Sequence, residues 1–152
     1  MDKQFSQNES GIRGDISTMP LVAIVILNWN GKKYLAQFLP SVMKSTYSNK
    51  KIIVADNAST DDSLLFLREN FPTVEILQNK VNEGFANGYN TALRQVEADY
   101  YVLLNSDVEV TTGWIEPVIT LMEADKKIAA CQPKVLDYNN KTKFEYAGAS
   151  GG

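Results

Sequence analysis

Four groups of amide, hydroxyl and carboxylate side chains follow directly after apolar runs of this sequence. They are NWNG at 28–31, DNASTD at 56–61, NKVNEG at 79–84 and NSD at 105–107. Ligands of open parallel sheets bind beyond the carboxyl ends of the strands. If the apolar runs are parallel strands, the four groups share one edge and line a pocket of amides and carboxylates with one aromatic side chain.

Asp56 and Trp29 are the candidate contacts for a nucleoside. Asp56 follows the run IIVA, so its carboxylate can accept hydrogen bonds from a base imide or a ribose hydroxyl. The alternative is an acid that caps or closes a turn. Trp29 follows the first apolar run and can stack on a base, although a lone tryptophan also serves as a core residue. The residues alone leave both alternatives open.

Asp107 is the candidate metal ligand. The chain contains no histidine, so a metal needs oxygen ligands, and a hard cation such as Mg²⁺ or Mn²⁺ would take them from Asp107 and a diphosphate. A solvated turn residue is the alternative. Gly84 and Gly88 straddle a predicted helix start, where backbone N–H groups can meet phosphate oxygens. The same glycines equally permit close helix packing.

The elements that must position these groups alternate between strands and helices. The unbroken β-branched run 21–27 suits a central strand that is covered on both faces. The other predicted strands are 51–56, 73–78, 100–105 and 128–133. Predicted helical stripes are Leu64-Leu67-Phe71, Phe85-Tyr89-Ala92-Leu93-Val96 and Trp114-Ile115-Val118-Ile119-Met122, with a further helix over 34–43. The alternation predicts an α/β fold, with a mostly parallel sheet flanked by helices in three layers.

Local signals predict where these helices begin or end. Pro40 should break or kink the helix over 34–43, because proline lacks a backbone N–H. Ser59 is the predicted N-cap of the second helix, and Thr111 or Thr112 the predicted N-cap of the last.

Size and composition predict one globular domain. The chain has 152 residues and 44% hydrophobic content, which suits a single core. Residues 1–18 read as a flexible N-terminal extension and 19–152 as the domain. The turn sequence DYNN at 137–140 predicts a hairpin or an irregular excursion near the end of that domain.

Charge and hydropathy argue against several classes of partner. The net charge of −3 and the scattered basic residues give no general attraction for nucleic acid. The longest apolar run, 21–27, is too short for a transmembrane segment, and the polar N-terminus lacks a secretory signal. Cys131 is the single cysteine, and its apolar neighbours predict a buried thiol in a reducing compartment.

The motifs, taken in order, resemble family 2 glycosyltransferases. The segments that carry the resemblance are VAIVILNWNGKKYL at 22–35, IIVADNASTDDS at 52–63, NEGFANGYNTAL at 82–93 and YYVLLNSDVEVTTGWIE at 100–116. The NWNG and NxGFAxGxN variants look most similar to rhamnosyltransferase-like bacterial members that build cell-surface polysaccharides. The resemblance implies a GT-A fold, of which this chain is the nucleotide-binding part.

The resemblance also implies roles for single residues. Trp29 matches the residue that packs against the base, and Asp56 matches the acid that hydrogen-bonds uracil or thymine. Asn105 and Asp107 match the two ends of the DXD motif, with Asp107 the Mg²⁺ or Mn²⁺ ligand, and Asn105 removes one charge from that motif. Tyr89 stands where an arginine often contacts the diphosphate. The implied nucleotide-sugar contacts are Asn28, Trp29, Asn30, Asp56, Asn82, Gly84, Asn87, Asn105 and Ser106.

The implied reaction is inverting transfer from a UDP- or dTDP-sugar to a glycan or lipid-linked acceptor. The catalytic base and the acceptor contacts are expected beyond Gly152, so the chain is expected to bind the nucleotide yet transfer little or no sugar. The implied location is the cytoplasm, with the full-length protein peripheral at the inner membrane face.

Two other classes remain as alternatives. A sugar-phosphate nucleotidyltransferase would need a glycine-rich basic loop where NWNGKK stands. A flavodoxin-like or receiver-like module would need acids at the positions of Asn28 and Asn79.

Overall fold

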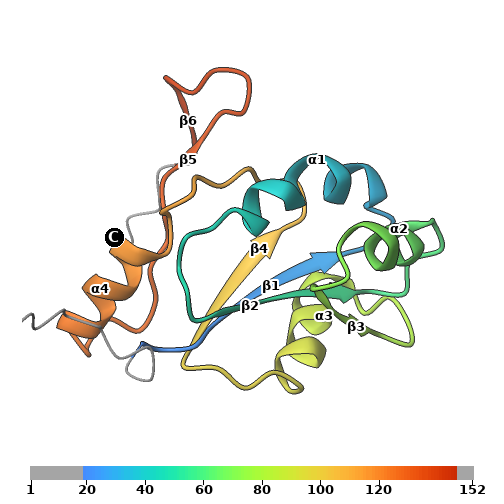
Figure 1. The fold of residues 1–152 in the computed structure, drawn as a ribbon, viewed down its shortest axis with the longest axis horizontal. Helices are drawn as coiled ribbons and strands as arrows, with labels where there is room; N and C mark the ends of the chain where they lie inside the picture. The colour runs from blue at the N-terminus through green and yellow to red at the C-terminus, as the bar shows by residue number, and fades with distance from the viewer. Residues whose placement is uncertain (1–18, 147–152) are drawn as a thin grey trace, which may run out of the picture.

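The computed structural model describes residues 19–146, so the predicted N-terminal extension at 1–18 lies outside the described residues. Strands and helices alternate along most of this range (Figure 1). The strands are β1 (Val22–Asn28), β2 (Lys50–Asp56), β3 (Glu75–Gln78), β4 (Tyr100–Asn105), β5 (Val135–Leu136) and β6 (Phe144–Tyr146). The helices are α1 (Lys32–Met43), α2 (Ser63–Asn70), α3 (Gly84–Leu93) and α4 (Glu116–Ala124).

β1 to β4 form one parallel sheet with the strand order β3-β2-β1-β4. The inner strand β1 is almost wholly buried on both faces, which explains its unbroken apolar sequence. The register aligns Asn28 with Asp56, Leu27 with Asn105, and Asp56 with Gln78. The carboxyl ends of all four strands therefore lie at the same edge of the sheet.

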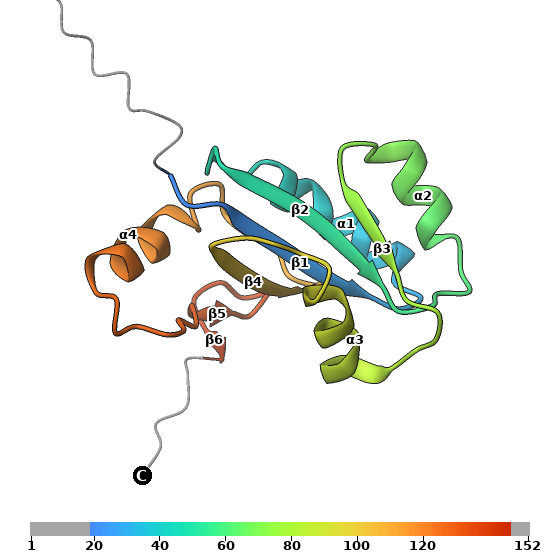
Figure 2. The same cartoon turned by 90° about the horizontal axis from the view of Figure 1, so that it is seen from below.

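Helices cover the two faces of the sheet, so the predicted three-layer α/β fold is confirmed. Figures 1 and 2 show α1 and α3 on opposite faces. The even-numbered residues of β1 from Val22 to Ile26 pack with α1, α2 and α4. Ala23 and Val25 pack with Tyr89, Ala92 and the residues that follow α3. This alternation follows from the two-residue period of a strand.

Pro40 was expected to break or kink this helix, and it does not break it, because α1 runs from Lys32 to Met43. Leu35 and Leu39 precede this proline, Val42 follows it, and all three are buried against the sheet. Most helical stability in proteins comes from such packing, which here offsets one missing backbone hydrogen bond.

The predicted N-caps are also wrong. α2 begins four residues after Ser59, whose hydroxyl instead accepts hydrogen bonds from the Asn28 side chain and the Asn30 backbone N–H. α4 begins at Glu116, beyond Thr111 and Thr112. The Thr112 carbonyl accepts two hydrogen bonds from Thr46, its backbone N–H at 2.8 Å and its hydroxyl at 3.0 Å.

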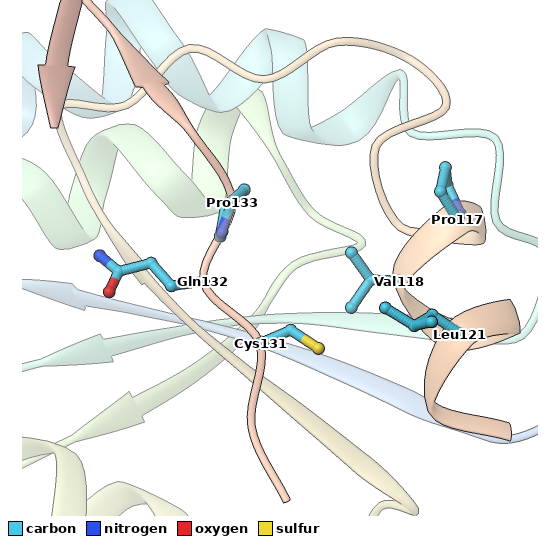
Figure 3. A pocket seen from close by; sticks show the side chains of 6 residues that line it. All are labelled: Pro117, Val118, Leu121, Cys131, Gln132 and Pro133. Carbon is cyan, nitrogen blue, oxygen red and sulfur yellow. The ribbon is translucent and has the colours of Figure 1, made fainter. Parts of the chain in front are cut away.

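The strand predicted over 128–133 is not formed, and Cys131 is exposed rather than buried. An apolar run becomes a strand only where another strand supplies hydrogen bonds, and this segment pairs with none of the described strands. It lies beside α4 instead, where Pro117, Val118 and Leu121 of the helix and Cys131 of the segment line a cavity of about 390 Å³ (Figure 3). β5 and β6 form the predicted hairpin around the turn at 137–140.

Candidate site at the carboxyl edge of the sheet

The end of β1 is joined to the end of β2 by buried hydrogen bonds. The Asn28 Nδ2 atom donates to Asp56 Oδ1 at 3.0 Å and to Ser59 Oγ at 3.1 Å. Asp56 Oδ2 accepts the backbone N–H of Ser59 at 2.9 Å. Asn28 and Asp56 have no exposed surface, so this group of contacts acts as an internal brace between two loops.

Asn30 extends this brace toward solvent. Its backbone lies in the left-handed region, with φ of 49°, a conformation that asparagine tolerates better than most residues. Its side-chain oxygen accepts the backbone N–H groups of Thr60 at 2.7 Å and Asp61 at 3.2 Å. The loop after β1 and the loop after β2 are therefore fixed relative to each other.

Asp61 closes the same pair of loops on the outside. Its carboxylate accepts the backbone N–H of Lys32 at 3.1 Å and that of Ser63 at 3.0 Å. Partial burial opposes ionisation, but the hydrogen bonds from Ser63 and Lys32 outweigh it and lower the pKa of Asp61. The ionised carboxylate thus holds the start of α1 against the start of α2.

Asn57 is a residue of this edge that the sequence did not single out. It is 2% exposed, and its amide bonds to four groups of the 79–84 loop. The only signal in the sequence is an Asp-Asn pair after a strand, which also occurs in ordinary turns.

The side chains that face solvent at this edge come from three of the loops. Trp29 is 58% exposed, and Asn105 and Asp107 are exposed at the end of β4. Other predicted contacts in the exposed class are Asn30, Asn82, Gly84 and Asn87, while Ser106 is partly buried. The edge thus offers exposed aromatic, amide and carboxylate groups to a polar ligand.

Two residues of the predicted α3 stripe behave differently from each other. Phe85 was expected to pack inward, but it is 65% exposed, because it lies on the first turn of α3 beyond the edge of the sheet. Tyr89 is buried, and its hydroxyl donates to the Leu104 carbonyl at 2.9 Å. Burial raises the pKa of Tyr89 to about 12, so the phenol stays protonated.

Asp56 faces the protein interior in this structure. Both carboxylate oxygens accept hydrogen bonds from Asn28 and Ser59. Contact with a base would require the side chain to become exposed, so that role stays a prediction. The observed role of Asp56 is to hold the two loops in register.

A cation could be held at the end of β4 only with help from a ligand. Within residues 19–146 no group of three or more His, Cys, Asp or Glu side chains could hold a metal ion. Asp107 supplies one carboxylate and Asn105 one amide oxygen. Mg²⁺ commonly takes one or two protein carboxylates and completes its shell with water and substrate phosphates. The donor set therefore fits a cation that arrives with a diphosphate.

The fold and this edge together define an α/β domain of the nucleotide-binding kind, with polar groups gathered beyond the carboxyl ends of parallel strands. The chain belongs to Glycosyl transferase family 2, whose sequence profile matches residues 23–148. This membership favours the transferase interpretation over the nucleotidyltransferase and receiver alternatives.

Curated relatives are longer than this chain. A glycosyltransferase of Haemophilus influenzae is 32% identical over 114 residues, which are 73% of this chain and 35% of that protein. The Escherichia coli UDP-Glc:alpha-D-GlcNAc-diphosphoundecaprenol beta-1,3-glucosyltransferase WfaP is 31% identical over 109 residues, 71% of this chain and 43% of that protein. The chain thus spans less than half the length of either relative.

Solved structures share the fold. Staphylococcus aureus TarS 1–349 in complex with UDP-GlcNAc has a TM-score of 0.62 and 20% identity, over 68% of this chain and 31% of that one. The Pyrobaculum calidifontis mannosyltransferase PcManGT, in complex with GDP-Man and Mn²⁺, has a TM-score of 0.55 and 24% identity, over 59% and 28%. At these identities the likeness shows the GT-A-like fold. No helix in the described part of the chain is long and apolar enough to cross a membrane.

Proposed function

We propose that this chain binds the nucleoside diphosphate of an activated sugar and serves as the donor-binding part of an inverting glycosyltransferase. The observation that carries the proposal is the convergence of Trp29, Asn105 and Asp107 at one edge of the sheet in a family 2 domain. A flat aromatic surface suits a base, amides suit a ribose, and the Asp107 carboxylate suits a cation that accompanies a diphosphate.

Each exposed group has a role in this proposal. Trp29 stacks on the base, and Asn30 and Ser106 hydrogen-bond the nucleoside. Asn82, Gly84 and Asn87 lie at the start of α3, where the positive end of the helix dipole favours phosphate oxygens. Asp107, with Asn105 beside it, would hold Mg²⁺ or Mn²⁺, and a cation there would supply positive charge toward a nucleoside diphosphate.

The proposed donor and acceptor draw support from the motifs and from one relative. We infer a UDP- or dTDP-sugar as donor, with a rhamnosyl group among the candidates, and a glycan or lipid-linked acceptor for cell-surface polysaccharide synthesis. The E. coli relative is named for a UDP-sugar donor and a diphosphoundecaprenol acceptor. Such an acceptor would place the whole protein in the cytoplasm at the inner membrane face. The chain spans less than half the length of these relatives, so the proposal for it concerns donor binding.

Calorimetric titration of the chain with UDP and with dTDP, each with and without Mn²⁺, tests the proposal. We expect binding that Mn²⁺ strengthens. Trp29→Ala should weaken it about tenfold, the loss expected for one stacked base, and Asp107→Asn should abolish the Mn²⁺ effect. Phe144→Ala is the matched control, because that ring is equally exposed, at 58%, and lies in the β5–β6 hairpin. The proposal fails if neither nucleotide binds, or if the Trp29 and Phe144 variants bind equally.

A further inference from the structure

We propose that Asn57 is a positioning residue, which sets the place of the first turn of α3 at the carboxyl edge and thereby controls nucleotide affinity without touching the ligand. The claim about affinity rests on the proposed function. The claim about position rests on the contacts of one buried side chain.

The Asn57 amide uses all of its hydrogen-bonding capacity on the loop that leads into α3. Its Nδ2 atom donates to Asn82 Oδ1 at 2.8 Å and to the Gly84 carbonyl at 3.0 Å. Its Oδ1 atom accepts from Asn79 Nδ2 at 3.1 Å and from the Glu83 backbone N–H at 3.2 Å. Two donors and two acceptors are the usual full complement of an asparagine amide.

The backbone around Asn57 is anchored to the two inner strands. Its N–H donates to the Asn28 carbonyl at 2.8 Å, and the Asn79 N–H donates to the Asp56 carbonyl at 2.8 Å. The side chain therefore connects a rigid part of the sheet to a loop that has no strand partner of its own. A change at Asn57 leaves the sheet hydrogen bonds intact and releases the loop.

α3 packs directly on this amide. A Cβ atom added to Gly88 would lie 3.1 Å from Asn57 Nδ2 and 3.0 Å from Leu27 Cδ1, both tighter than ordinary contact. Gly88 thus lets the helix backbone approach Asn57 closely. Asn57 therefore contacts α3 at two points: it packs against Gly88, and it donates a hydrogen bond to the Gly84 carbonyl at the start of the helix.

An aspartate of the same shape cannot replace this amide. In Asn57→Asp an oxygen would face the Asn82 side-chain oxygen and the Gly84 carbonyl, which are both acceptors. Rotation of the Asn82 amide would relieve one contact, but its Oδ1 atom also accepts the Gly84 N–H at 2.8 Å, and that bond would be lost. The Gly84 carbonyl belongs to the backbone and has no such freedom.

Hydrogen exchange of the wild-type chain and of three variants tests the position, and titration with UDP and dTDP tests the affinity. Asn57→Asp is the main variant. Asn79→Ala is a milder one, because it removes a single donor to Asn57. Ser45→Ala is the control, since Ser45 is also buried and hydrogen-bonded but contacts Val42 and Trp114.

In the Asn57→Asp variant, the backbone amides at 83–88 should exchange at least about tenfold faster than in wild type, and exchange in β1 and β2 should not change. The same variant should bind the nucleotide about tenfold more weakly, because each of the two lost hydrogen bonds contributes a several-fold factor. Asn79→Ala should show the same pattern with a smaller change. Ser45→Ala should lower the unfolding temperature without changing the exchange at 83–88 or the nucleotide affinity.

Three results would overturn the inference: unchanged exchange at 83–88 in both Asn57→Asp and Asn79→Ala, faster exchange spread evenly over the sheet, or equal loss of affinity in Ser45→Ala. If the wild-type chain binds neither nucleotide, the proposed function and the claim on affinity both fail. The exchange data then still decide whether Asn57 positions α3.

Discussion

Gly31→Ala tests whether the space beside Asn28 requires glycine after the NWN turn. A Cβ atom at position 31 would lie 2.3 Å from Asn28 Oδ1. Gly31 has φ of −108°, which any residue adopts, so contact alone excludes alanine. Asn28 is fully buried and donates to Asp56 and Ser59. It therefore cannot move aside without stretching or losing both hydrogen bonds.

The expected loss of folding stability is about 2–4 kcal/mol. Each of the two Asn28 hydrogen bonds contributes about 1 kcal/mol net, and over-packing of a filled site costs about 1–3 kcal/mol. A small shift of Asn28 relieves part of the over-packing and keeps part of the hydrogen bonding, so the loss falls below the full sum of the two contributions. Urea unfolding followed by circular dichroism measures it. With a slope of about 2 kcal/mol per molar for a domain of this size, the midpoint should fall by roughly 1–2 M.

Gly113→Ala is the matched control for this variant. A Cβ atom at Gly113 would have its closest neighbour, Thr46 Oγ1, at 3.8 Å. The free energy of unfolding of Gly113→Ala should therefore differ from wild type by no more than about 0.5 kcal/mol. Asn28→Ala should relieve the clash, so the double variant with Gly31→Ala should lose less than the sum of the two single losses. Equal midpoints for the two glycine variants would refute the reasoning.

Two further predictions concern the loop after β2. Ala58 has φ of 60°, a conformation that costs about 1–2 kcal/mol for a residue with a Cβ atom. This cost exceeds the entropy that glycine would add to the unfolded chain, so Ala58→Gly should raise the free energy of unfolding, measured in urea, by about 0.5–1 kcal/mol. A free energy of unfolding below that of wild type would contradict this account. The pKa of Asp61 is lowered on folding, so its contribution to stability is complete above the unfolded value of about 3.9 and disappears as pH falls further. The difference in unfolding free energy between wild type and Asp61→Asn should therefore shrink below about pH 4, and parallel pH profiles would argue against it.

The carboxyl edge was predictable because each of the first four strands ends where the sequence changes from apolar to polar. The register then places Asn28 beside Asp56, as a parallel sheet requires. Hydropathy therefore identified both the sheet and the groups at its edge. The GT-A-like α/β fold follows from the same alternation of strands and helices.

The bonding within that edge was not predictable, because amide side chains carry no directional signal in a sequence. Asn57 and Asn30 both lie in loops just after a strand, yet one is buried and the other exposed. The segment 128–133 shows the same limit for strands. Its run of small and apolar residues resembles a strand, but a ladder partner lies elsewhere in the chain and leaves no mark on the run itself.

The polar residues of the edge form two sets, one buried and one exposed, with different roles. Asn28, Asp56 and Asn57 are buried, and their side chains hydrogen-bond one another or polar groups of the loops after β2 and β3. Apolar residues of similar volume are often as stabilising as buried polar groups, but they cannot fix the direction of a backbone. The buried set therefore determines loop shape. In the proposed function Trp29, which lies between Asn28 and Asn30, would meet a base from a loop that is already held, so little ordering free energy would be lost on binding.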